Sequence, residues 1–121
     1  MANKKTLVLG ASANPSRYSY LAVNFLQSRG HEVIAIGRRE GKVGQVQVET
    51  VARNIKDLDT ITLYLNPANQ KQYYEYLLSL HPKRIIFNPG AENEELSRMA
   101  RERGILTQEA CTLVLLSTGQ Y

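Results

Sequence analysis

The feature that most constrains the fold of this chain is an alternation of short apolar runs with segments of helical periodicity. Such an alternation is typical of a parallel sheet whose two faces are covered by helices. The sequence therefore predicts a three-layer α/β fold, in which a doubly wound, mostly parallel sheet of five to six strands has helices on both faces. The expected strands are Thr6–Gly10, His31–Ile36, Val46–Val51, Thr60–Leu65, Arg84–Phe87 and Ile105–Thr107.

Helices are expected between these strands. In the first helix, Leu21, Phe25 and Leu26 form an apolar stripe that predicts the face turned toward the sheet, and Gly30 is the expected C-terminal cap. The expected helices are Tyr18–Arg29, Pro67–Leu80, Glu92–Arg103 and a terminal turn or short helix at Thr112–Ser117, whereas Gly37–Gln45 is expected to be a polar loop.

Length and composition limit the classes of protein to which the chain can belong. Its 121 residues predict one domain over 1–121, large enough to fold without disulfides. The single cysteine gives no indication of an oxidising compartment, so the cytoplasm is the default location. No apolar run approaches the roughly 20 residues that cross a bilayer, and no membrane partner is expected. The net charge of +4 suits an anionic ligand, but the basic residues are not interleaved with aromatics, so no nucleic-acid partner is predicted.

The stretch Leu7–Arg17 combines a strand, a loop of small residues and a helix start. In a doubly wound sheet, ligands bind outside the carboxyl ends of the strands where the strand order reverses, here between the first and fourth strands. A helix N-terminus at that point attracts a phosphate group. The candidate phosphate-binding residues of this loop are Gly10, Ala11, Ser12, Asn14, Ser16 and Arg17.

The second strand ends in Gly37, Arg38 and Arg39. Enzymes that use NAD place an acidic residue near this position, so the two arginines argue against NAD. They suit a phosphorylated ribose, either the 2′-phosphate of NADP or the 3′-phosphate of coenzyme A, although a solvated loop explains them equally well. The G-x-G-x-x-G fingerprint is also absent, because the chain has Ser12 and Pro15 near the positions where the second and third glycines of that motif would fall.

Three further loops follow strands and belong to the same predicted crevice. Asn66 and Pro67 are favoured N-cap and first-turn residues, so a helix start already explains them. Asn88 and Gly90 are first of all a turn, and a lone cysteine such as Cys111 is most often buried and inert. The candidate ligand-binding residues in these loops are Asn66, Pro67, Asn88, Gly90 and Cys111, and no catalytic residue or metal ligand is predicted.

Several of these motifs, taken in order, resemble a known family. They are L-V-L-G-A-S-A-N-P-S-R at Leu7–Arg17, G-H-E-V-I-A-I at Gly30–Ile36, G-x-V at Gly44–Val46, Asn66-Pro67 after a strand, A-E-N-E-E-L at Ala91–Leu96, and Cys111 near the end. In these, the chain is similar to the small stand-alone CoA-binding domain proteins, which are related to the nucleotide-binding domain of the succinyl-CoA synthetase alpha subunit.

The resemblance implies a Rossmann-like fold that binds coenzyme A or an acyl-CoA, with Gly10, Ala11, Ser12 and Arg17 matching the phosphate loop of the family. Two positions depart from the family pattern, which commonly has Asn-Pro after the second strand and a proline after the arginine of the first loop. This chain has Gly37-Arg38 and Tyr18 there. The departures concern the adenosine end of the site.

Three functions remain open at this point. The first is a small-molecule binding or regulatory module for CoA or acyl-CoA, without autonomous activity. The second is a minimal NADP-linked oxidoreductase or another nucleotide-binding enzyme. The third is an interaction subunit with a vestigial nucleotide pocket, whose partner is another protein or a second copy of the chain.

Overall fold

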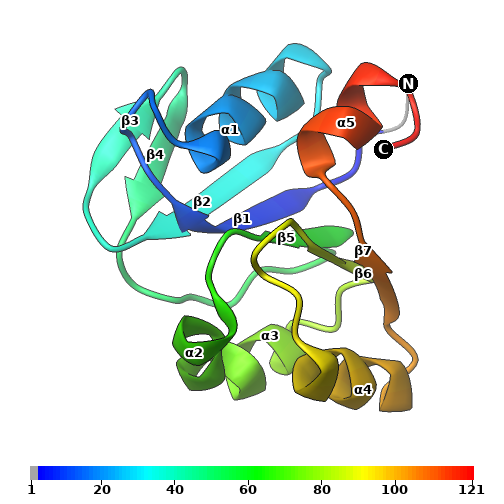
Figure 1. Cartoon of the computed structure of the whole chain (residues 1–121). Helices are drawn as coiled ribbons and strands as arrows, with labels where there is room; N and C mark the ends of the chain where they lie inside the picture. Colours follow the sequence, from blue (N-terminus) through cyan, green and yellow to red (C-terminus); the bar gives the residue numbers. More distant parts are fainter. Residues whose placement is uncertain (1–2) are drawn as a thin grey trace.

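The computed structural model describes residues 3–121, and the first two residues of the predicted domain lie outside this range. Figure 1 shows a central sheet between two layers of helices. In chain order the elements are β1 (Thr6–Ala11), α1 (Tyr18–Ser28), β2 (Val33–Gly37), β3 (Gly41–Val43), β4 (Val46–Glu49), β5 (Thr60–Leu63), α2 (Pro67–Gln70), the 3₁₀ turn η1 (Lys71–Tyr73), α3 (Tyr74–Ser79), β6 (Arg84–Phe87), α4 (Glu94–Glu102), β7 (Leu106–Glu109) and α5 (Thr112–Ser117).

The strand order is β3-β4-β2-β1-β5-β6-β7, and every pairing is parallel except that between β3 and β4. The chain builds the sheet outward from β1 to β2 and β4, then returns to add β5 on the other side of β1. The doubly wound α/β fold is therefore confirmed, and the strand order reverses between the first and fourth predicted strands, as expected.

Alternation along the strands divides the core between the two faces of the sheet. In β1, Leu7 and Leu9 belong to the cluster that packs under α3 and α4, whereas Val8 belongs to the cluster that packs against α1 and α5. All three side chains are buried. In Figure 1, α1 and α5 lie side by side on one face, and α2, α3 and α4 cover the other.

The segment Gly37–Gln45 is not wholly a loop, because it contains β3. Val43 pairs with Val46 across the two-residue connection Gly44-Gln45, and Gly44 has a φ of +59°. A two-residue connection with a positive φ favours an antiparallel hairpin. The prediction missed this strand because β3 has only three residues, of which Val43 alone is apolar and buried.

The stripe predicted for α1 is correct at Leu26 and wrong at Leu21, and Phe25 packs against the core from a partly buried position. Leu26 is buried, but Leu21 is 43% exposed and Phe25 only half-buried. The buried positions of the helix are Ser19, Ala22, Val23 and Leu26. Small side chains turned toward the sheet let the start of the helix pack closely against it, and Leu21 is left on the outer side.

The remaining boundaries differ by a few residues, with local causes. The helix expected over Pro67–Leu80 is divided into α2, η1 and α3, and its first turns are polar. Asn93 is the N-cap of α4, since its side chain accepts a hydrogen bond from the Leu96 N–H at 3.1 Å. Helix α4 therefore begins at Glu94, two residues after the predicted start at Glu92.

Candidate functional site

The loops after β1, β2, β5, β6 and β7 lie at the same edge of the sheet, because these strands are parallel. We call it the carboxyl edge. It carries all the predicted site residues: Gly10, Ala11, Ser12, Asn14, Ser16 and Arg17 from the end of β1 onward, Gly37, Arg38 and Arg39 at the end of β2, Asn66 and Pro67 after β5, Asn88 and Gly90 after β6, and Cys111 after β7.

Two glycines allow the strand ends to approach closely at the centre of this edge. Gly10 has a φ of +90° at a register shift in β1, and a Cβ there would lie 2.9 Å from the backbone carbonyl of Tyr64. A Cβ on Gly37 would lie 2.0 Å from the carbonyl oxygen of Ala11. Gly10 thus gives β1 a narrow exit, and position 37 must be glycine because the backbone of β1 leaves no room for a side chain.

The loop Ser12–Arg17 is held by its own hydrogen bonds. The Ser12 hydroxyl oxygen accepts from the Asn14 N–H at 3.0 Å, and the Asn14 carboxamide oxygen accepts from the Ser16 N–H at 3.0 Å and the Ser16 hydroxyl at 2.9 Å. The Asn14 carbonyl accepts from the Arg17 N–H at 3.0 Å. Asn14 therefore organises the loop that leads into α1.

The N-terminus of α1 has no side-chain cap, and its first turn has no acidic residue. Its positive end is therefore left without a carboxylate or a capping oxygen from a side chain. Arg17, the N-cap residue, is exposed, as are Arg38 and Arg39 at the end of β2. The ion pairs found within residues 3–121 involve other side chains. Three guanidinium groups thus border this part of the carboxyl edge.

Asparagines support the other half of the site. Asn66 caps α2, since its side-chain oxygen accepts from the Asn69 N–H at 2.9 Å, and this confirms the predicted cap. Asn88 is buried, and its amide donates to the Thr62 hydroxyl at 2.6 Å and to the Leu63 carbonyl at 2.9 Å. Its oxygen accepts from the Thr112 N–H at 2.8 Å. Asn88 therefore joins β5, β6 and the start of α5.

These bonds bring the segment after β7 back across β6 to β5. The hydroxyls of Thr62 and Thr112 are 2.7 Å apart, so Cys111, the N-cap residue of α5, lies near the end of β5. Cys111 itself is half-buried. Gly90 stands apart from this group, because it is exposed and a Cβ there would meet nothing within 4 Å.

Tyr64 follows β5 at the centre of the carboxyl edge and is not among the predicted site residues. Its N–H donates to the Leu9 carbonyl at 2.9 Å, while its hydroxyl is buried and has no hydrogen-bond partner among the described residues. Burial raises the pKa of this hydroxyl well above its ordinary value, so the group is a neutral donor. Because Tyr64 lies within the expected strand Thr60–Leu65, nothing in the sequence set it apart.

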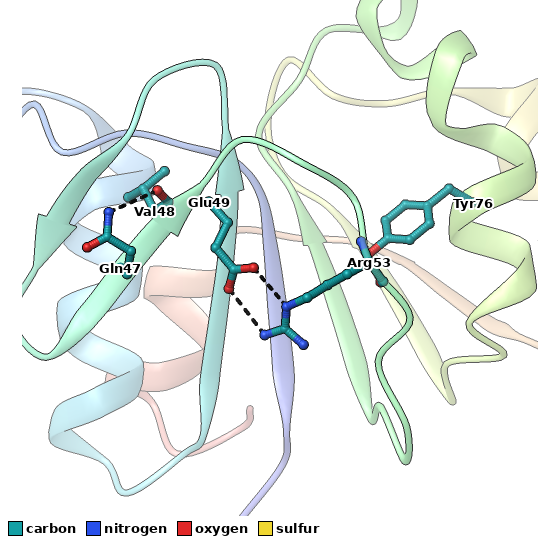
Figure 2. Close-up of polar contacts among 5 residues, drawn as sticks. All are labelled: Gln47, Val48, Glu49, Arg53 and Tyr76. Atoms are coloured by element: carbon teal, nitrogen blue, oxygen red, sulfur yellow. Dashed lines mark hydrogen bonds and ion pairs between the residues drawn. The ribbon is translucent and has the colours of Figure 1, made fainter.

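Glu49, Arg53 and Tyr76, which are also absent from the predicted site residues, lie together where the chain leaves β4. Figure 2 shows the Arg53 guanidinium against the Glu49 carboxylate, with N–O distances of 2.7 and 3.1 Å. This hydrogen bonding lowers the pKa of Glu49. The Tyr76 hydroxyl of α3 donates to the Arg53 carbonyl at 2.6 Å. The three residues fix the chain where it leaves β4. A four-residue spacing indicates pairing only on a helix, and Glu49 ends a strand, so no sequence signal pointed to this pair.

Within residues 3–121, no group of three or more His, Cys, Asp and Glu side chains is arranged to hold a metal ion. None of the helices in the same range combines the length and apolar character needed to cross a bilayer.

Comparisons with known proteins agree with this architecture. The crystal structure of an uncharacterized protein is 50% identical to the chain, covers 100% of both chains and has a TM-score of 0.97. A conserved hypothetical protein from Pyrococcus furiosus is 26% identical, with a TM-score of 0.74 over 87% of this chain and 91% of its own. A hypothetical protein from Pyrococcus horikoshii OT3, 21% identical over 96% of this chain and 83% of its own, shares the fold with a TM-score of 0.85.

No curated protein matches the chain significantly. A family model does match, over residues 4–117, and its description is CoA binding domain. This match extends over nearly the whole chain and includes every strand and helix described above. The chain therefore belongs to the CoA binding domain family, as its sequence motifs indicated.

Proposed function

We propose that this chain binds coenzyme A or an acyl-CoA, with the pyrophosphate against the Ser12–Arg17 loop and the N-terminus of α1. The observation that carries the proposal is the state of that helix end, which has neither a side-chain cap nor an acidic residue in its first turn and has the exposed Arg17 beside it. Backbone N–H groups, the helix dipole and a guanidinium together favour a diphosphate. Membership of the family supports the same class of ligand.

The adenosine end is assigned to the β2 side of the same edge. Arg38 and Arg39 follow β2 and are exposed, and the close contact of Gly37 with Ala11 holds the end of β2 next to the phosphate loop. Guanidinium groups at the end of β2 suit the 3′-phosphate of CoA. The Glu49–Arg53 pair would border this end and keep the chain after β4 in place.

NADP is the second candidate, because the same two arginines would also suit its 2′-phosphate. It is the less favoured one, because Ser12 and Pro15 interrupt the glycine fingerprint of dinucleotide-binding loops. We propose a binding or regulatory role, since the groups gathered at the carboxyl edge are those that hold a phosphate: backbone N–H groups, hydroxyls and guanidinium groups.

Calorimetric titration with CoA, acetyl-CoA and NADPH tests the proposal. CoA should bind, and Arg17→Ala should weaken it roughly tenfold or more, because a charge-assisted hydrogen bond to phosphate is lost. Arg98→Ala is the matched control: this arginine is also exposed but lies on α4, on the other face of the sheet, and its removal should leave the affinity unchanged.

Dephospho-CoA tests the adenosine end separately. Dephospho-CoA should bind the wild-type protein more weakly than CoA does. The double variant Arg38→Ala, Arg39→Ala should bind the two ligands with about equal affinity. Absence of CoA binding at millimolar ligand would overturn the proposal, and NADPH binding in its place would favour the dinucleotide. An empty site in a protein that co-purifies with another chain would favour an interaction subunit.

A further inference from the structure

The connection between β2 and β3 is short, and both of its ends pack against the backbone that leads into α1. It consists of the exposed residues Arg38–Glu40, which we call the arginine connection. Gly37, before it, lies against the carbonyl oxygen of Ala11. Gly41, after it, is so close to Ala13 that a Cβ on Gly41 would lie 2.6 Å from the Ala13 Cβ. The two contacts stand on either side of the first residue of the proposed phosphate loop.

The contact between Gly41 and Ala13 leaves no room for a side chain. Two carbon atoms in normal contact are about 3.5–4.0 Å apart, and both of these Cβ positions are fixed rigidly to the backbone. Gly41 is not among the glycines with a positive φ, so the neighbouring loop, and not the backbone conformation, excludes a side chain here. A side chain at position 41 would therefore separate the arginine connection from the Ser12–Arg17 loop.

The β3–β4 hairpin that follows the arginine connection is fixed to α1 by one side chain. The Gln27 amide nitrogen donates to the Val43 carbonyl at 3.0 Å, and the amide oxygen accepts from the Gln45 N–H at 3.1 Å. Gly44, in the turn of the hairpin, lies against the same amide, since a Cβ there would be 2.9 Å from the Gln27 nitrogen. The hairpin is thus anchored beside the helix whose N-terminus carries the proposed diphosphate site (Figure 1).

The charge of the arginine connection indicates what such a fixed arrangement can bind. Arg38 and Arg39 are exposed, and within residues 3–121 neither forms an ion pair with Glu40 or with another carboxylate. Their backbone is held at a set distance from the N-terminus of α1. Cations that are positioned in advance favour a ligand with two phosphate groups at the matching spacing, because binding the second group does not require the loop to be ordered.

We propose that Gly41 holds the arginine connection against the Ser12–Arg17 loop, so that Arg38 and Arg39 bind the 3′-phosphate of CoA at a fixed distance from its diphosphate. This inference rests on the proposed function and adds a determinant of its specificity. The preference for CoA over dephospho-CoA depends on the packing of Gly41 on Ala13 as well as on the charge of the arginines. Gly41 acts through the arginines and is a positioning residue.

The ratio of the affinities for CoA and dephospho-CoA tests this inference, measured by calorimetry at a fixed salt concentration. The wild-type protein should bind CoA roughly tenfold more tightly. Gly41→Ala should reduce this ratio to about threefold or less, because the new Cβ moves the arginines away from the phosphate loop. The double variant Gly41→Ala, Ala13→Gly lacks the methyl group that the new Cβ meets and should restore the wild-type ratio. A purely structural role of Gly41 would change both affinities by the same factor.

A glycine inserted between Arg39 and Glu40 tests the same inference without creating a clash. The insertion lengthens the arginine connection and leaves both of its anchoring glycines in place, and exposed loops tolerate such changes. It should lower the ratio while the affinity for dephospho-CoA stays unchanged. Gly104→Ala is the matched control: its φ of +76° makes the substitution destabilising, but it follows α4 on the other face of the sheet and should leave the ratio unchanged.

The outcomes separate this inference from the proposed function. A wild-type ratio in Gly41→Ala or in the insertion variant would overturn the inference and leave CoA binding as proposed. Failure of Ala13→Gly to restore the ratio in Gly41→Ala would also overturn it. If the wild-type protein binds CoA and dephospho-CoA equally, the assignment of the adenosine end and this inference both fail, and the diphosphate site stands. If no CoA species binds, the proposed function fails together with this inference.

Discussion

At the scale of single residues, close approach of backbones determines the shape of the carboxyl edge. Gly10 could be predicted as the residue at the narrow exit of a strand, because glycine before a small-residue loop is a local signal. The need for Gly37 could not, because it arises from the carbonyl of Ala11, 26 positions away in a neighbouring strand. The sequence indicated Gly37 as a binding residue, and its packing role appears only in three dimensions.

Replacing Gly37 with alanine should therefore destabilise the folded protein. The new Cβ would lie 2.0 Å from the Ala11 carbonyl oxygen, so β1 and β2 must separate locally. We expect a loss of about 3 kcal/mol in the free energy of unfolding, measured by urea denaturation. Gly30→Ala is the control: it has a φ of +81° but no atom within 4 Å of the new Cβ, and should lose about 1 kcal/mol. Equal losses in the two variants would contradict this account.

At the scale of elements, two helix caps differ in what the sequence could reveal. Asn66 is followed directly by Pro67, and its cap of α2 is local, so the pattern alone predicted it. Asn88, which follows β6, accepts the Thr112 N–H at the start of α5, 24 residues further along the chain. The strand runs and parallel order were similarly predictable from periodicity. The outward face of α1 was not, because it depends on how closely Ser19 and Ala22 pack against the sheet.

The two caps should differ in their contribution to stability. Asn88→Ala removes three hydrogen bonds and leaves buried donors and acceptors unpaired, so it should lower the free energy of unfolding by about 3 kcal/mol. Asn66→Ala removes one exposed capping bond and should lower it by about 1 kcal/mol. Chemical denaturation of both variants measures the difference, and a larger loss in Asn66→Ala would show that the buried asparagine is not the link between β5, β6 and α5.

At the scale of the whole molecule, the amino edge of the sheet joins the two ends of the described chain. The Lys4 amino group donates to the Tyr121 carbonyl at 2.6 Å, and the Arg84 guanidinium lies 4.5 Å from the centre of the Tyr121 ring. The His31 ring packs edge-on against Tyr121, and its Nδ1 accepts from the Lys4 backbone N–H at 3.0 Å. This cluster lies at the opposite edge from the candidate site.

His31 should make the stability of the protein depend on pH. Its burial, together with the nearby charge of Lys4, lowers its pKa from the ordinary value of 6.5. The unfolded chain therefore binds more protons than the folded one between the lowered pKa and 6.5, and stability falls as the pH drops through that window. Urea denaturation between pH 5 and 8 should show this slope, and His31→Asn should flatten it. An unchanged slope in that variant would assign it to another group.

The separation of the two edges has a consequence for how this protein can change over evolutionary time. Arg17, Arg38 and Arg39 are exposed at the carboxyl edge and form no ion pairs within the described residues, whereas the buried contacts of the two cores and of the amino edge lie elsewhere. Substitutions at these arginines leave the packed interior intact. Under the proposed function, the ligand that the protein prefers could therefore change through these arginines while the scaffold stays the same.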